Sequence, residues 1–553
     1  MSGTGNSNSA PDTHATKEQG NTAPRRSRIV SVTGEIRRRL PRIPPGDVIA
    51  GVSMAFVLIP QSLAYATVAG LPAYVGLYAA ALPPLAAAFF ASSPWLQTGP
   101  TAVTSILVAG ALATVAIPAT GEYIMLAAML AVVVGVFRVA IGLAHAGKIV
   151  HLMSEPVLRG FTSGAALLIL ISQIPVVLGL PPAAGGGAPT TLIAIFTQSE
   201  SWNVEAVMLS FATIAIVYGA TRIHPIIPGV LLATVGAVLY AEIFAYSGPV
   251  VGELPSVFPS LTLGLPWTRL PTLVLPGVVI ALVGFTEAAS IARTYAARER
   301  QRWDPDRDFI SQGVANIAAG VSGAFPVGGS FSRSGLAHTL GARTRWAGAV
   351  TGLTALAFMP FAGLLSALPD AVLGGMIIIS VIRLITIEPI IELWRLSRPQ
   401  FIVASSTFLL TLLLAPRIDE AVVLGIGLAV AVHLWREFRV KLVSWTEGDA
   451  LHVRPEGVLW FGSAQMLETQ ILALLADNPR IGRLVLHMER LGRVDLTASI
   501  VIAQLVRDAR DGGLETEIVA VHPVTARALR RVLRQDRPGQ AGSPPRTREN
   551  TEE

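Results

Sequence analysis

The chain has 553 residues, of which 52% are hydrophobic and only 14% are charged, whereas soluble domains carry about 25% charged residues. Its mean hydropathy of +0.57 is typical of a membrane protein. The net charge of +6 does not indicate a nucleic-acid partner, because the arginines flank apolar segments, and the lack of cysteine excludes disulfides, thiol nucleophiles and thiolate metal sites.

The apolar segments divide the chain into a membrane part with polar flanks. Residues 1–40 are rich in Ser, Thr, Asn and Gly without a cleavable signal pattern, so we expect a disordered cytosolic tail. Residues 41–442 hold about fourteen candidate spans, which predicts a transmembrane domain. Lys and Arg gather in alternate connectors, so we expect both termini on the cytoplasmic side of a bacterial inner membrane.

Two of the candidate spans are short and interrupted. One follows Gln97-Thr-Gly-Pro100 and the other follows Pro326-Val-Gly-Gly329, so helices are predicted to begin at Thr101-Ala102 and at Ser330-Phe331. Non-helical backbone at membrane depth is tolerated only where protein or a water-filled cavity satisfies it. Two such helix N-termini facing each other halfway across the bilayer would bind an anion.

The two interruptions occupy corresponding places in the two halves of the membrane domain. Gln61 precedes Thr101 by 40 residues, and Glu287 precedes Ser330 by 43. Seven spans in each half would give the halves opposite orientations. We therefore expect a mainly α-helical, polytopic 7+7 inverted repeat, with repeat one over about 46–248, repeat two over about 270–440 and two half-helices at the midplane, which is transporter architecture.

The composition changes again after Ser444. Residues 446–535 alternate between strand-like and helix-like runs, which predicts a compact cytosolic α/β domain. Strands are expected over 451–453, 457–461, 484–487 and 517–521, and helices over 464–475, 495–510 and 524–533. Residues 536–553 contain repeated Pro and Gly and are predicted to be a disordered tail.

The order and spacing of several motifs resemble the SulP family of anion permeases and exchangers, which carry a C-terminal STAS domain. The matching stretches are Asp47–Ala66, Gly70–Tyr78, Gly99–Ala102, Phe285–Arg293 and Phe325–Ser334. The resemblance implies a core domain that moves against a gate domain, and a homodimer that forms through the STAS region.

The same resemblance implies a set of site residues between the first, third, eighth and tenth spans. The candidates for substrate binding are Gln61, Thr101, Ala102, Ser330 and Phe331, to which Arg333 would add positive potential. Neutral donors of this kind replace part of an oxyanion's hydration without holding it too tightly. The implied function is uptake of a small inorganic oxyanion, with sulfate as the first candidate.

Glu287 is the candidate for proton coupling. A carboxylate beside an anion repels it and is costly to desolvate, and protonation removes both penalties. Relatives that move bicarbonate pair such an acid with a hydroxyl one turn later to bind sodium, but Ile291 stands at that position here. The alternatives are transport of bicarbonate or a dicarboxylate with protons or sodium, anion exchange, and a channel.

Each of these residues also has a purely structural interpretation. Glu287 could pair with Arg333 in a buried ion pair. Gln61 could hydrogen-bond to the backbone groups that Pro60 leaves without a helical partner. Thr101 and Ser330 could be helix caps, and Phe331 could be a packing residue.

No enzymatic activity is expected, because a membrane-embedded enzyme would need clustered acids or histidines within the spans. No spacing of ligands indicates a metal, and no glycine-rich loop indicates a nucleotide, so no cofactor is expected. Thr497 matches the position of a phosphorylatable hydroxyl in related bacterial regulators. The alternative is that Asp495 caps a helix and Thr497 is an ordinary residue of its first turn.

Overall fold

The computed structural model describes residues 43–180, 188–224, 226–256, 258–259, 261–262, 264–438, 440–519 and 547–548. The tail predicted over residues 1–40 lies outside this set. So do residues 520–535, which include the helix predicted over 524–533, and all of 536–553 except 547–548.

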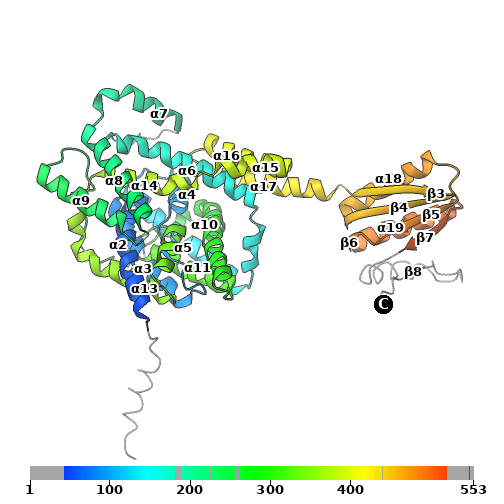
Figure 1. The fold of residues 1–553 in the computed structure, drawn as a ribbon, viewed down its shortest axis with the longest axis horizontal. Coiled ribbons are helices and arrows are strands. Elements are labelled where there is room, and N and C mark those ends of the chain that lie inside the picture. The colour runs from blue at the N-terminus through cyan, green and yellow to red at the C-terminus, as the bar shows by residue number, and fades with distance from the viewer. Residues whose placement is uncertain are drawn as a thin grey trace, which may run out of the picture. The chain divides into compact units, whose positions relative to one another are not determined.

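In its described residues, the first half of the membrane domain contains seven spans, and the third is the interrupted one. The spans are α2 (Pro45–Val68), α3 (Ala73–Phe90), β1 (Thr98–Gly99) with α4 (Ala102–Leu112), α5 (Gly121–Leu143), α6 (Glu155–Val177), α8 (Val204–Ile223) and α9 (Gly229–Phe244). The connectors carry η1 (Gly147–Leu152), α7 (Ala188–Thr197) and η2 (Ser199–Ser201). Figure 1 shows these helices in blue to green.

The second half repeats the pattern, again with an interrupted third span. Its spans are α10 (Leu270–Arg298), α11 (Pro305–Val321), β2 (Gly328–Gly329) with α12 (Phe331–Thr339), α13 (Trp346–Phe358) with η4 (Met359–Leu365), α14 (Asp370–Val381) with η5 (Ile382–Leu384), α16 (Arg398–Leu413) and α17 (Ile418–Glu437). The connectors carry η3 (Trp267–Arg269) and α15 (Ile387–Leu396).

The packing of the spans confirms the inverted repeat. In an inverted repeat, each span of the first half corresponds to the span seven places later, so α3 corresponds to α11 and α5 to α13. The contact between α5 and α11 therefore has a counterpart between α13 and α3, and both contacts are present. In the same way α6 against α16 becomes α14 against α8. Three contacts join a span to its own counterpart in the other half, namely α3–α11, α6–α14 and β1–β2. Contacts of this kind are expected on a pseudo-two-fold axis. Because each half has an odd number of spans, the halves have opposite orientations.

Most of these contacts fall within two groups of spans, although α4 and α10 also touch α17. The core group contains α3–α5 and α10–α13, together with α2, where a Cβ on Gly51 would lie 2.5 Å from the Cβ of Val350 on α13. The gate group contains α6, α8, α9, α14, α16 and α17. Glycines allow close packing within the core group. A Cβ on Gly313 of α11 would lie 2.7 Å from the backbone N of Val139 on α5, and one on Gly352 of α13 would lie 2.5 Å from the carbonyl O of Ala81 on α3. The core group is therefore a tightly packed unit.

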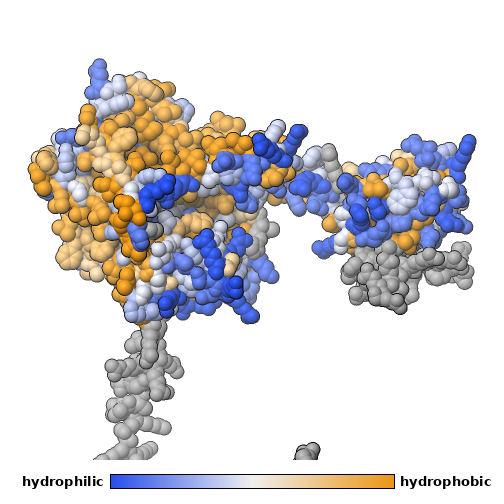
Figure 2. All heavy atoms as spheres, in the orientation of Figure 1, coloured by the Kyte–Doolittle hydropathy of each residue, from blue (hydrophilic) through white to orange (hydrophobic). Residues whose placement is uncertain are grey.

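The outer surface of the helical part is apolar, as a lipid-facing surface must be. In the described part of the chain, nine helices are long and apolar enough to cross a membrane. Large hydrophobic side chains such as Phe211, Leu239, Phe244 and Leu413 are exposed on it. Figure 2 shows hydrophobic residues over much of this part, whereas the C-terminal α/β part is mostly hydrophilic.

The C-terminal part is an α/β fold with one mixed sheet. Its elements are β3 (Lys441–Glu447), β4 (Ala450–Leu459), α18 (Phe461–Asp477), β5 (Arg483–His487), β6 (Leu491–Val494), α19 (Leu496–Asp511), β7 (Glu515–Val519) and β8 (Thr547–Arg548). The strand order is β3-β4-β5-β7-β8, and β6 also pairs with β4. Only β3 is antiparallel to its neighbour.

Two details of this part differ from the prediction. The sequence indicated neither β3 nor β6, because β3 is largely polar and exposed and β6 has only four residues. The strand expected over 457–461 is the end of the longer β4, and Phe461 begins α18 instead.

Candidate functional site

The two interrupted spans meet through their extended segments. β1 and β2 pair antiparallel, with Thr98 opposite Gly329 and Gly99 opposite Gly328. The helices that follow begin at Ala102 and Phe331, as predicted. Gly99 has a φ of +155°, and a Cβ there would lie 3.3 Å from the Nη2 atom of Arg333, so this position favours glycine. We call this two-strand pairing the seam.

The two helix N-termini beside the seam are capped differently. Thr101 forms a capping box, in which its Oγ1 accepts a hydrogen bond from the backbone N of Thr104 (3.3 Å). Ser330 makes no such bond, and its hydroxyl lies 3.2 Å from the hydroxyl of Ser332. The interpretation as a side-chain cap therefore fits Thr101 and not Ser330.

Polar side chains of α11 support the seam from behind. Gln312 donates from Nε2 to the Oγ1 of Thr98 (2.8 Å). The Asn316 amide accepts from the backbone N of Val327 (2.9 Å) and donates to the carbonyl O of Val327 (3.1 Å). The Asn316 bonds satisfy backbone groups of Val327 that a continuous helix would have satisfied internally, and the Gln312 bond holds the Thr98 side chain. The break is therefore supported in an apolar environment.

Arg138 on α5 is a second support, which was not among the residues predicted from the sequence. Its buried guanidinium donates to the carbonyls of Ala281 (3.1 Å), Ile280 (3.1 Å) and Val327 (3.0 Å). Among the described residues it forms no ion pair with a carboxylate. A lone arginine within an apolar span was the available signal, because such residues are rare and functional. Arg138 thus leaves an uncompensated positive charge behind the seam.

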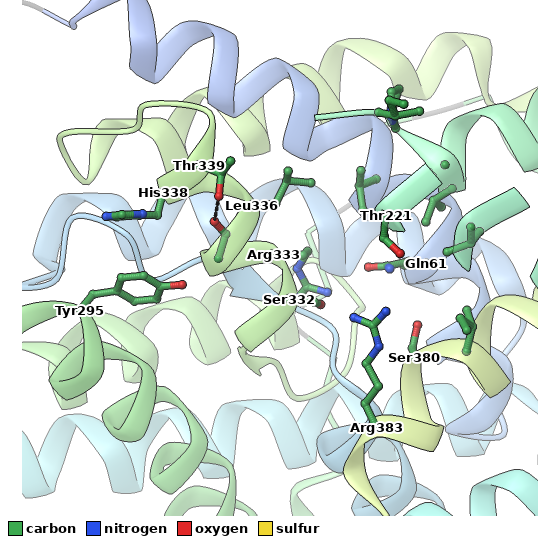
Figure 3. A pocket seen from close by; sticks show the side chains of 18 of the residues that line it. Gln61, Thr221, Tyr295, Ser332, Arg333, Leu336, His338, Thr339, Ser380 and Arg383 are labelled. Carbon is green, nitrogen blue, oxygen red and sulfur yellow. Dashed lines mark hydrogen bonds between the residues drawn. The ribbon is translucent and has the colours of Figure 1, made fainter. Parts of the chain in front are cut away.

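A cavity of about 440 Å³ lies between the core and gate groups. Its core wall comes from α2, α10 and α12, and its gate wall from α8, α9, α14 and η5. Three arginines line it, Arg298, Arg333 and Arg383, together with His338. No described Asp or Glu is among its lining residues. Figure 3 shows Gln61, Ser332, Arg333 and Arg383 pointing toward a common space.

Two of the predicted site residues, Gln61 and Arg333, line this cavity. Arg333 is 2% exposed and donates from Nη2 to the carbonyl O of Pro100 (2.9 Å), while its Nε has no partner. Gln61 is 7% exposed, and its Oε1 has no partner. Buried polar atoms without partners are uncommon, so both side chains have capacity left for a ligand.

The other predicted residues are not among those that line the cavity. Thr101, Ala102 and Ser330 are buried at the two helix N-termini, whereas Phe331 is 46% exposed. Glu287 is half-buried on α10 and interacts electrostatically with Arg333. The two do not form an ion pair in the part of the chain that the structure describes, so the structural pairing considered for them is absent.

Thr497 lies far from this site along the chain, in the C-terminal α/β part. Asp495 caps α19 by accepting a hydrogen bond at Oδ1 from the backbone N of Ala498 (2.7 Å). Thr497 is exposed in the first turn of that helix. The cap predicted for Asp495 is present, and modification of Thr497 stays a prediction.

Comparisons with known proteins agree with this arrangement. The model of the sulfate permease family matches residues 45–407, and that of the STAS domain matches residues 444–536. A probable sulfate transporter of Mycobacterium tuberculosis is 30% identical over 532 residues, which cover 90% of this chain and 92% of the relative.

Two solved structures share the fold. One is the murine Solute Carrier 26 family member A9 anion transporter in the inward-facing state, with a TM-score of 0.82, 20% identity and coverage of 93% of this chain and 92% of that one. The other is the transmembrane domain of a cyanobacterium bicarbonate transporter, with a TM-score of 0.60, 22% identity and coverage of 70% of this chain and 97% of that one.

Proposed function

We propose that this chain, which belongs to the sulfate permease family, is a secondary active transporter that takes up sulfate or a similar small oxyanion together with protons. The observation that carries the proposal is the cavity between the two helix groups, lined by three arginines and by no described carboxylate. A cavity of this kind attracts anions and repels cations.

The chemistry of the core wall suits an oxyanion. The guanidinium of Arg333 is a planar fork of donors that matches the oxygens of such an anion, and its Nε is still unpaired. The Gln61 amide can rotate to present its NH₂ group, and Ser332 adds a hydroxyl. Arg138 adds a fixed positive charge behind the seam. Neutral donors together with the single arginine Arg333 in the central part of the core wall allow the anion to bind and also to leave.

The location of the cavity supports alternating access. Its two walls belong to different helix groups. A movement of one group against the other therefore changes the side of the membrane to which the cavity is open. The glycine contacts within the core group favour movement of that group as a unit. The family relationship and the apolar exterior place the chain in a membrane as a multi-pass protein.

Glu287 is our candidate for the coupling residue. It lies close enough to Arg333 to feel its charge, and it has no ion pair within the described residues. A negative charge there competes with the anion for Arg333, and a proton ends that competition. The sodium alternative needs a hydroxyl at position 291, where the side chain is the buried Ile291.

The proposal also includes the identity of the substrate, the identity of the coupling ion and the orientation of the termini in the membrane. The 30% identical relative is described as a probable sulfate transporter, which favours sulfate over bicarbonate or a dicarboxylate. The arginine-rich connectors favour cytoplasmic termini in a bacterial inner membrane. A homodimer through the STAS domain, and regulation at Thr497, follow from the family resemblance alone.

Purified protein in liposomes tests the proposal. Uptake of labelled sulfate, bicarbonate and fumarate is measured under an imposed proton gradient, a sodium gradient and no gradient. We expect sulfate to accumulate and an inward proton gradient to accelerate it. Three outcomes would contradict the proposal. Preference for bicarbonate or fumarate would favour transport of those substrates, and acceleration by sodium alone would favour sodium coupling. Flux that no gradient drives uphill would favour a channel.

The coupling role of Glu287 has its own test. We expect Glu287→Gln to retain binding of labelled sulfate, because a neutral amide replaces the protonated acid, and to lose acceleration by the proton gradient. The measurement is the ratio of uptake with and without the gradient in the wild type and the variant. An undiminished ratio in the variant would show that the coupling proton binds elsewhere.

A further inference from the structure

The cavity has a second cationic wall on its gate side, opposite Arg333 on its core side. Arg383 lies in η5, directly after α14 in the gate group, whereas Arg333 lies on α12 in the core group. In Figure 3 the side chain of Arg383 reaches from its helix toward Ser332, Arg333 and Gln61. The two guanidinium groups thus face one space from opposite sides of the boundary that must move during transport.

Of the three cavity arginines, Arg383 has the charge most available to a ligand. Arg333 uses Nη2 on the carbonyl of Pro100, and the guanidinium of Arg298 lies 5.7 Å from the ring centroid of Tyr295, within range of a cation–π contact. Arg383 is exposed to the cavity, and in the described part of the chain it has neither an ion pair nor a hydrogen bond to protein.

The turn that carries Arg383 is held in place by α6. The hydroxyl of Ser163, which is fully buried, donates to the carbonyl O of Leu384 (3.4 Å) and accepts from the backbone N of Thr386 (3.1 Å). The backbone on the C-terminal side of Arg383 is therefore fixed to a neighbouring gate helix. A fixed backbone limits the conformational entropy that the side chain loses on binding.

We propose that Arg383 is the gate-side ligand of the anion, and that Arg333 and Arg383 together hold one doubly charged oxyanion across the boundary between the two groups. This inference rests on the proposed function. Two guanidinium groups in one cavity repel each other, and a dianion compensates both charges, whereas a monoanion leaves one positive charge uncompensated. The pair therefore selects for divalent oxyanions such as sulfate over monovalent ones such as nitrate.

The test compares Arg383→Gln and Arg383→Lys with a matched control, Arg395→Gln. Arg395 is an exposed arginine on α15 that does not line the cavity, so its substitution removes the same charge elsewhere. In liposomes, sulfate KM is measured together with inhibition by selenate, a dianion, and by nitrate, a monoanion. Size-exclusion profiles and melting temperatures establish that each variant is folded.

We expect Arg383→Gln to raise sulfate KM roughly tenfold or more, because a charge-assisted bond is lost. Inhibition by selenate should weaken in parallel and inhibition by nitrate much less, Arg383→Lys should be intermediate, and the control should match the wild type. Unchanged sulfate KM in Arg383→Gln, or equal weakening of sulfate and nitrate, would overturn the inference while leaving the proposed function intact.

A binding measurement separates this inference from the proposed function. If the wild type takes up no sulfate, the proposed function fails, and equilibrium binding of labelled sulfate to the purified protein then tests Arg383 directly. Weaker binding in Arg383→Gln than in the wild type and the control would support the inference. Equal binding in all three proteins, or no binding in any, would overturn it.

Discussion

The two helix N-termini at the seam predict opposite effects for two similar substitutions. Thr101 accepts a capping bond from Thr104 in a buried position, so Thr101→Ala should cost about 1 kcal/mol, within the range of about 0.5–2 kcal/mol for lost caps. Ser330 has no capping bond to lose, and its hydroxyl bonds that of Ser332, so Ser330→Ala should cost less than Thr101→Ala, about 0.5 kcal/mol. The Ser330 hydroxyl is instead a proposed anion donor.

The assay combines melting temperature in detergent with sulfate KM in liposomes. For a domain of about 400 residues, 1 kcal/mol corresponds to roughly 1–2 °C. We expect Thr101→Ala to melt lower by that amount and Thr101→Ser, which keeps the hydroxyl, to melt like the wild type. Ser330→Ala should melt normally but show a KM roughly 3- to 10-fold higher, as for a lost neutral hydrogen bond. Lower melting with an unchanged KM in Ser330→Ala would refute the reasoning and make its hydroxyl structural.

Two further predictions concern the frame of the core group. A Cβ on Gly313 would lie 2.6 Å from the Cγ2 atom of Val139, so Gly313→Ala should destabilise the protein by about 1–3 kcal/mol, whereas Gly236→Ala, where a Cβ meets nothing within 4 Å, should not. Similar melting temperatures for these two variants would contradict the packing argument. The buried Asp308 accepts from Trp303 Nε1 (2.7 Å) and from two backbone N–H groups of the loop after α3. Asp308→Ala leaves three donors without partners and should cost at least about 2 kcal/mol, and Asp308→Asn less, since one acceptor oxygen remains; equal melting of both variants and the wild type would count against this.

Much of the membrane fold could be predicted because its determinants are local in the sequence. Gly99-Pro100 and Gly328-Gly329 interrupt apolar segments, and the helices do begin at Ala102 and Phe331. The 7+7 inverted repeat, the family and the STAS domain are confirmed. These features follow from chain-order patterns that need no knowledge of which helices touch.

What could not be predicted depends on contacts between distant segments. Arg383 ends an ordinary span, and only the packing of α14 against α8 and α6 brings it opposite Arg333. The unpaired Nε of Arg333 and the missing cap of Ser330 are likewise properties of three-dimensional geometry. The amphipathic α15 was missed because it is too short to span, and its apolar residues continue those of α14 in the sequence.

The strand pairing that joins the interrupted spans has a consequence for how this architecture diversifies. Three of its four residues are glycine, and the contact between Gly99 and Gly328 is made by main chain alone. Among the described residues, the side-chain bonds that support this pairing include those of Gln312, Asn316 and Arg138, and none comes from Gln61, Ser332 or Arg383. Substitutions at Gln61, Ser332 or Arg383 can therefore change which anion the cavity binds without disrupting the pairing of the two interrupted spans.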